Sequence, residues 1–234
     1  MREDQAERWL HYVMSLTGGY LGGYAILNRS GLLGAAQTSN MINTVLNLAG
    51  GSFSGLAIRL GALVLYVSGI VVTVLIPRYT RWNLKNMSLA LDVAAVLVLG
   101  FLPQGMDNML ALYPLFFAMS VQWCTFQGCG GYASATVFST NNLRQFATAV
   151  TAFYFGREEK MREKIKFYGA TLTAFHLGVA ASWPCCNLAG VKSAWICLAP
   201  LAAAGYLAAA GRREENVKIC ECRGEGGNVR GLAG

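Results

Sequence analysis

Apolar residues in this chain gather in blocks of membrane-spanning length, separated by short stretches that hold most of the charged residues. A helix that crosses a bilayer needs about 20 consecutive, predominantly apolar residues. A soluble amphipathic helix instead shows apolar positions every three or four residues, with polar ones between them. The block pattern therefore predicts six transmembrane helices, over residues 9–28, 60–77, 87–103, 108–126, 167–188 and 194–210.

Two further stretches are weakly apolar and carry a run of polar residues. The first, residues 32–51, contains TSNMIN at residues 38–43. The second, a helix expected over residues 134–155, contains STNNLRQ at residues 139–145. Polar side chains at membrane depth usually face a bundle interior or a wet cavity. We therefore expect two shorter motif helices, either re-entrant or buried, within an all-α polytopic membrane helix bundle.

The two motifs are related by a shift of 102 residues. The shift superimposes Asn40 on Asn142, and the apolar blocks on either side correspond as well. Self-similarity at a fixed spacing indicates a duplicated chain. We therefore expect an internal two-fold repeat, with repeat one at residues 9–103 and repeat two at residues 108–210.

The distribution of basic residues distinguishes two topologies. If the motif helices do not cross fully, the N-terminus, the loops before residues 87 and 167, and the tail all lie on one side. The other side then holds only Arg29, Arg59 and Lys192. The positive-inside rule places the basic side and both termini in the cytoplasm, and three spans per repeat make the repeats inverted. If both motif helices cross, the repeats are parallel; we favour the six-span arrangement.

Composition supports a membrane protein and limits its partners. Of the 234 residues, 54% are hydrophobic and 13% are charged, against about 25% charged in an ordinary soluble domain. The net charge of +7 comes from basic residues between apolar blocks, a pattern that fits contact with the anionic headgroups of a lipid bilayer. The sequence contains no basic stripe with interleaved aromatic residues, so we expect no nucleic-acid partner.

The two ends of the chain differ from its body. Residues 1–8 are mixed in charge and lead into the first apolar block without a cleavage site, so we expect a cytoplasmic N-terminus and not a signal peptide. Residues 9–210 form the expected membrane domain. Residues 211–234 are charged and then glycine-rich, which predicts a disordered cytoplasmic tail.

Arg144 is the strongest candidate for a functional side chain, because it lies on an apolar helix well before the charged loop at residues 157–166. A structural or snorkelling arginine and a contact to a substrate anion both remain open. Asparagine side chains donate and accept hydrogen bonds, which suits a neutral polar or zwitterionic ligand, although they join helices equally well. The candidate substrate site consists of Thr38, Asn40, Asn43, Thr140, Asn141, Asn142, Arg144 and Gln145.

Three further polar residues lie in apolar segments. Asp92 and His176 are lone titratable groups that can relay protons, and a neutral histidine is the natural switch near neutral pH. The alternatives are an aspartate at a helix end and a satisfied interior histidine. Gln122 is expected to form a hydrogen bond between helices.

Motifs for catalysis and metal binding are missing from the sequence. It contains no HExxH, GxSxG or Walker-type loop, and its histidines and cysteines are not paired at ligand spacing. Cys220 and Cys222 in the tail are two ligands, too few for a closed zinc site. We therefore expect no enzymatic activity, no metal and no cofactor.

Several short runs in both halves are similar to those of a known family. They are AMSVQW at 118–123, GY at 131–132, STNNLRQ at 139–145, GYL at 19–21 and QTSN at 37–40. These runs resemble the YoaK family, small bacterial multi-pass membrane proteins that form a domain of unknown function, number 1275. The resemblance extends over about residues 16–207. It implies a multi-pass protein of the bacterial plasma membrane and brings no established activity.

This chain departs from the family pattern at two places. The family often carries an acidic residue just after its Gly-Tyr-apolar element, where this chain has Gly22. The glycine of the family's Thr-Gly-Asn element is Ser39 here and Asn141 in the second copy. A role that depends on the family's acidic residue therefore does not carry over to this chain.

The leading functional hypothesis is a small-solute transporter or channel of the bacterial inner membrane, with a central polar site where the two repeats meet. Its partners are then the lipid bilayer and an unknown small solute or anion. The alternative is a structural or regulatory membrane protein whose polar motifs lock helices together. The GGYLGG run at residues 18–23 forms a flat groove for close helix approach, which serves a homodimer or the chain's own bundle equally well.

Overall fold

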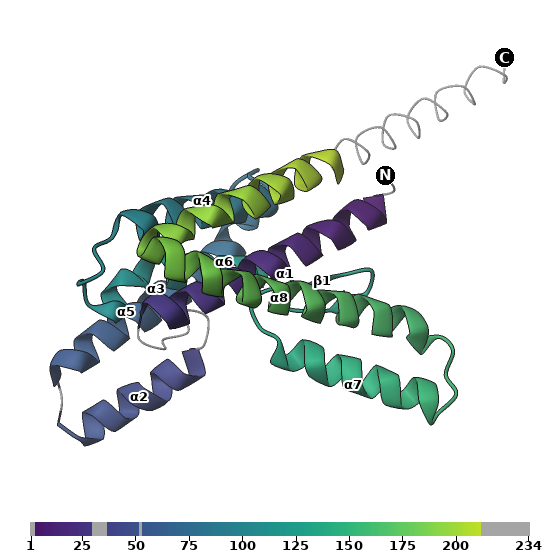
Figure 1. The fold of residues 1–234 in the computed structure, drawn as a ribbon, viewed down its shortest axis with the longest axis horizontal. Coiled ribbons are helices and arrows are strands. Elements are labelled where there is room, and N and C mark those ends of the chain that lie inside the picture. Colours follow the sequence, from purple (N-terminus) through teal and green to yellow (C-terminus); the bar gives the residue numbers. More distant parts are fainter. Residues whose placement is uncertain (1–2, 30–36, 52, 212–234) are drawn as a thin grey trace, which may run out of the picture.

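The computed structural model describes residues 3–29, 37–51 and 53–211, and the fold is almost entirely helical (Figure 1). The helices are α1 (Glu3–Asn28), α2 (Gln37–Ala49), α3 (Phe53–Tyr79), α4 (Leu84–Phe101), α5 (Asn108–Ala111), α6 (Tyr113–Thr125), α7 (Thr140–Tyr154), α8 (Met161–Ala189) and the 3-10 helix η1 (Gly190–Cys197). A last helix covers residues 198–211. The strands β1 (Gly128–Cys129) and β2 (Tyr132–Ala133) pair antiparallel. The predicted tail lies outside the described residues, apart from Gly211.

Three helical segments are long and apolar enough to cross a membrane. They are Gly55–Tyr79, Leu84–Phe101 and Met161–Gly211. The third is 51 residues long and reverses direction at Gly190, where φ is +54°, so that the last helix runs back toward the start of α8 (Figure 1). These segments indicate a membrane protein, because their exposed side chains are largely apolar and need lipid to cover them.

The six predicted spans are recovered only in part. The predicted span at residues 108–126 is divided into α5 and α6 at Leu112. Pro114 stands at the start of α6, and a proline there lacks the N–H that would continue a helix from α5. The remaining spans correspond to α1, α3, α4, α8 and the last helix, although α1 carries charged residues in its first turns and is not among the three clearly apolar segments.

The core forms where α1 packs along α8 and where α6 packs against α3 and α4. A methyl group on Gly19 would overlap the carbonyl oxygen of Phe175, and one on Gly178 would overlap that of Leu16. The backbones of α1 and α8 are therefore in direct contact, which small residues allow between membrane helices. The glycine groove of α1 is occupied by the protein's own bundle in this structure.

The helix ends form two groups at opposite ends of the bundle. One group joins the starts of α1, α4 and α8 with the end of α6. Lys85 pairs with Glu7 and Arg8 with Glu163, and Thr125 lines one pocket with residues of α1 and α4. We call this the basic end, because the described basic residues nearest to it are Arg8, Arg78, Arg81, Lys85, Arg157, Lys160, Arg162, Lys164 and Lys166.

At the opposite end of the bundle lie the ends of α1 and α4 and the starts of α3 and α6. Arg29, after α1, is fully buried and donates from Nη1 to the carbonyl oxygens of Pro103 (3.2 Å) and Gln104 (3.3 Å) after α4. The Tyr113 hydroxyl donates to the carbonyl oxygen of Ile58 at 2.6 Å, which joins the start of α6 to the start of α3. Consecutive long helices therefore run in alternating directions. As a result, α1 and α6 are antiparallel, and so are α3 and α8.

Candidate functional site

The segment between α6 and the end of α7 enters the bundle from the basic end and returns to it. Gly128, Gly130 and Gly131 have positive φ values of 130°, 60° and 82°, conformations that glycine adopts without steric cost, and they turn the chain through the β1–β2 hairpin. Residues 134–137 then run along α1, from the His11 side chain toward Gly18. From Thr140, α7 leads back toward α8 at the basic end (Figure 1).

Asn142 holds this segment in place. Its Oδ1 accepts hydrogen bonds from Ser134 Oγ (2.9 Å) and from the Ala135 N–H (3.3 Å). Its Nδ2 donates to the carbonyl oxygens of Ala135 (2.7 Å) and Phe138 (3.2 Å). The side chain is 1% exposed, so its hydrogen-bonding capacity is used inside the protein. Of the two roles left open by the sequence, this geometry fits the joining of segments.

The network continues to α1 through a histidine that sequence reasoning missed. His11 is 2% exposed, its Nε2 lies 2.9 Å from Ser134 Oγ, and its ring stacks on Phe167 at 5.4 Å. Because the Ser134 hydroxyl donates to Asn142, His11 is assigned the tautomer that donates from Nε2. The available signal was its spacing of four from Ser15, which places it on the small-residue face of α1.

Three of the predicted site residues line one pocket. It has a volume of about 870 Å³ and lies between α3, the end of α6 and the start of α7. We call it the α7 pocket; its lining residues are Ile70, Trp123, Cys124, Gln127, Ala133, Ser134, Ala135, Phe138, Thr140, Asn141 and Arg144. The structure thus brings Thr140, Asn141 and Arg144 together.

The α7 pocket combines apolar walls with a cationic, hydrogen-bonding edge. Arg144 is exposed, and its Nη2 donates to Asn141 Oδ1 at 2.9 Å. It is the only charged residue of the lining. The N-terminus of α7 adds partial positive charge at Thr140. Apolar walls strengthen such electrostatic interactions. The pocket is therefore suited to a ligand with an anionic or polar head and an apolar body.

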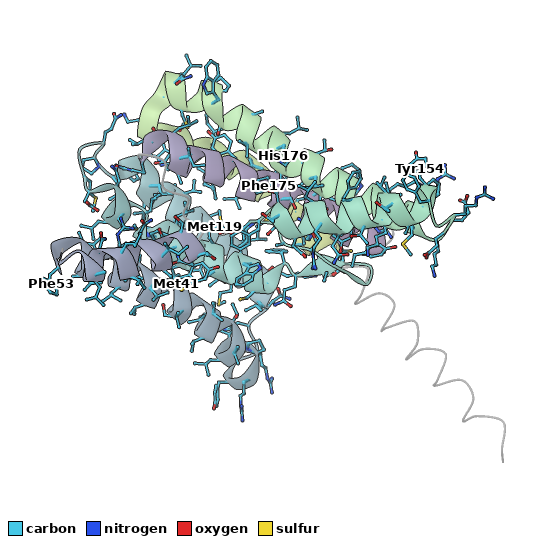
Figure 2. All side chains as sticks on the ribbon, turned by 90° about the horizontal axis from the view of Figure 1, so that it is seen from below. Met41, Phe53, Met119, Tyr154, Phe175 and His176 are labelled. Atoms are coloured by element: carbon cyan, nitrogen blue, oxygen red, sulfur yellow. The ribbon has the colours of Figure 1, made fainter. Side chains whose placement is uncertain are left out.

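The other predicted site residues lie elsewhere. Gln145 is partly buried on α7 and is not part of the pocket lining. Thr38, Asn40 and Asn43 lie on α2, which packs against α3, whereas α7 packs against α8. Figure 1 shows α2 and α7 extending in opposite directions from the middle of the molecule, so Met41 of α2 lies far from Tyr154, the last residue of α7 (Figure 2). The two motif helices thus pack on different neighbours, and the meeting of the two polar motifs stays a prediction.

The polar residues of α2 differ in their surroundings. Asn40 is buried, and its Nδ2 has no hydrogen-bond partner among the described residues. Asn43 donates weakly to Ser39 Oγ at 3.5 Å, and Thr38 is exposed. The outward face of α2 is apolar and includes Met41 (Figure 2).

The two candidate proton carriers do not form a pair. His176 lies on the exposed side of α8, where its Nδ1 is 2.8 Å from the carbonyl oxygen of Leu172. Asp92 lies fully buried on α4, and α4 and α8 are not neighbouring helices. Gln122, by contrast, joins segments as predicted: its Nε2 donates to the Met14 carbonyl oxygen (3.1 Å) and to Thr136 Oγ1 (3.0 Å).

Comparison with known protein families assigns the chain to one of them. Residues 10–207 match a family described as a protein of unknown function (DUF1275). This chain belongs to the DUF1275 family. The resemblance found in the motifs is thereby confirmed, and the DUF1275 match includes the whole α7 pocket. Neither the curated proteins nor the solved structures contain a significant match. The DUF1275 description carries no activity, so function has to be argued from the geometry.

Proposed function

We propose that this protein is a small-solute transporter or channel, and not an enzyme, whose α7 pocket binds the solute. One observation carries the proposal. The segment from Phe126 to Tyr154 enters the bundle from the basic end, ends its inward course beside Gly18 of α1, and starts a helix there. Helices that begin inside a membrane bundle present N–H groups and polar side chains at substrate depth in many transporters.

The arrangement of the helices supports an inverted duplication. Each half contains a long helix, a motif helix and two further long helices, and the equivalent helices run in opposite directions. Gly69 of α3 lies against Phe117 and Ser120 of α6, and Gly178 of α8 lies against Leu16 of α1. The shift of 102 residues carries Leu16 next to Phe117, so the crossings correspond on α1 and α6. It carries Gly69 to Thr171, seven positions before Gly178. Inverted repeats of this kind are widespread among transporters.

The charge distribution supports an orientation. The opposite end holds Arg29, Arg59 and Lys192, and the other described basic residues, apart from Arg144, belong to the basic end. By the positive-inside rule, the basic end and both termini face the cytoplasm of a bacterial inner membrane. The α7 segment is then a re-entrant loop that opens from the cytoplasmic side. The α2 helix is its counterpart from the outside.

The lining of the α7 pocket favours one class of solute. Arg144 and the start of α7 favour an anionic group, and the Asn141 amide can donate or accept one hydrogen bond. Trp123 and Phe138 provide apolar and aromatic surface. A small organic anion or zwitterion with an apolar body matches both parts.

A ligand screen with a charge-matched control tests the proposal. Full-length protein is purified in detergent, and its melting temperature is measured with small organic anions and zwitterions, in parallel with Arg144→Gln. Arg162→Gln is the control. Arg162 is exposed at the basic end, so its substitution removes the same charge outside the pocket. Stabilisation and flux into liposomes that are lost in R144Q and kept in R162Q support transport. No ligand and no flux would contradict it.

The second candidate function is a structural or regulatory membrane protein. The observation that favours it is the closed network of Asn142, in which every amide hydrogen-bonding atom meets a protein partner. In that case R144Q changes no response to any solute. A protein partner would then be sought.

A further inference from the structure

A carboxyl group without a partner lies in the middle of the bundle. Asp92 is at the centre of α4 and is 0% exposed. Neither of its carboxyl oxygens has a hydrogen-bond partner among the described residues. Buried polar groups in proteins are almost always hydrogen-bonded, so this arrangement requires an explanation.

The burial of Asp92 favours the protonated form of its carboxyl group. An ionised carboxylate without a partner or a metal is very costly in an apolar interior, whereas the neutral acid costs far less. In transmembrane segments, ionisable residues mark ion pathways and proton relays. Asp92 therefore holds its proton here.

Two further buried hydroxyl groups, neither with a hydrogen-bond partner in the described part of the chain, lie between Asp92 and the basic end. Ser88 lies four positions earlier on α4 and is fully buried, and its Oγ has no partner in the described structure. Leu84, four positions earlier again, lines a pocket of about 340 Å³ at the basic end. Positions four apart share a helix face and are about 6 Å apart along the axis. Thr125 lines the same pocket, and its Oγ1 is also buried without a partner.

No charged side chain of the described structure is paired with Asp92. The helices α3, α6 and η1 pack against α4, and α1 contacts it through Glu7 and through the Tyr24 hydroxyl, which lies 3.5 Å from the Leu99 carbonyl oxygen. Of the titratable side chains on these elements, only Cys197 of η1 has a described electrostatic interaction with Asp92. At the mouth of the pocket, Glu7 is already paired with Lys85. The last helix, residues 198–211, carries no charged residue.

We infer that Asp92 is a proton-binding site that exchanges its proton with solution at the basic end. No hydrogen bond joins Asp92 to Ser88 in this conformation, so exchange requires water to enter from the pocket beside Thr125. The carboxyl then releases its proton to that water, and the Ser88 hydroxyl hydrogen-bonds the entering water. Uptake follows the reverse order, and the entering water solvates the carboxylate while it lacks its proton. This site is separate from the α7 pocket and does not depend on the transport proposal.

Infrared difference spectroscopy tests the inference on full-length protein in vesicles of neutral lipid. A step from acidic to alkaline buffer is expected to remove a carboxylic-acid carbonyl band. The band is expected to be lost in Asp92→Asn and kept in Glu159→Gln, where the exposed acid lies in the α7–α8 connection. In Ser88→Ala, which keeps the carboxyl, the band is expected to exchange more slowly in heavy water.

Three outcomes would overturn the inference. A band that stays at every pH would mean a permanently neutral acid, and a band that persists in D92N would belong to another residue. A band that disappears on addition of sodium at constant pH would indicate a metal cation site. If D92N does not fold, Ser88→Ala decides the question, because unchanged exchange in that variant contradicts the route.

Discussion

Asn142 and Asn40 occupy matching positions in the two sequence motifs, but their surroundings differ. Asn142 makes four hydrogen bonds to a single loop. Asn40 is also buried, with an unpartnered Nδ2; the preceding residues 30–36 lie outside the described structure. The sequence identified both residues as important without distinguishing a structural amide from a ligand contact, because that difference depends on loop conformation.

Asn142→Ala is expected to destabilise the protein strongly. The substitution leaves the Ala135 N–H, the Ala135 carbonyl and the Ser134 hydroxyl without this partner, and each buried group left unsatisfied costs about 1–3 kcal/mol. Thermal unfolding in detergent measures the effect. Asn141→Ala is the control, because the Asn141 side chain bonds only to exposed Arg144 in the described structure; equal melting temperatures for the two variants would contradict the assignment.

At the scale of elements, apolar blocks predicted the long helices well, since a run of apolar residues needs an environment that only helices can occupy in lipid. The start of the second motif helix was misplaced. The prediction began at residue 134, whereas α7 begins at Thr140. Residues 134–139 are apolar enough for a helix, but hydrogen bonds to Gln122 and Asn142 hold them in another conformation. Such distant partners are not visible in local sequence.

The division of the apolar block at residues 108–126 and the packing of the two motif helices have similar causes. Pro114 was visible in the sequence, but a proline can also start a helix, and only packing shows which role it takes. The expected central site stays a prediction, because α2 packs mainly on α3 and α7 mainly on α8. Periodicity identifies polar faces, and it does not identify the helix that each face meets.

The crossing of α1 and α8 provides a test at this scale. Gly178→Ala is expected to cost about 3 kcal/mol or more, since overpacking a tight core costs about 1–3 kcal/mol and here the added methyl meets the Leu16 backbone. Gly205→Ala is the matched control, because no atom lies within 4 Å of its added methyl and alanine favours a helix by up to about 1 kcal/mol. Chemical denaturation of both variants measures the difference. Similar stability would mean that α1 and α8 do not touch.

At the scale of the whole molecule, the two ends of the bundle make a topological prediction. Single cysteines at Gln104 and Glu159, both exposed, mark the opposite end and the basic end. In a background without reactive native cysteines, a membrane-impermeant reagent is expected to reach position 104 from outside intact cells. Position 159 is expected to react only after the membrane is opened. Labelling of both positions from one side would contradict the six-span arrangement.

The contact between α1 and α8 joins helices that are far apart in the sequence, so it can form only late in synthesis of the chain. During synthesis, the glycine face of α1 is made long before α8. His11 and Ser134, which join α1 to the segment before α7, are 123 positions apart. Until α8 has been synthesised, the glycine groove of α1 has no helix packed in it. A chain truncated before Met161 therefore keeps that groove unfilled, and we expect the quality-control proteases of the cell to remove it quickly.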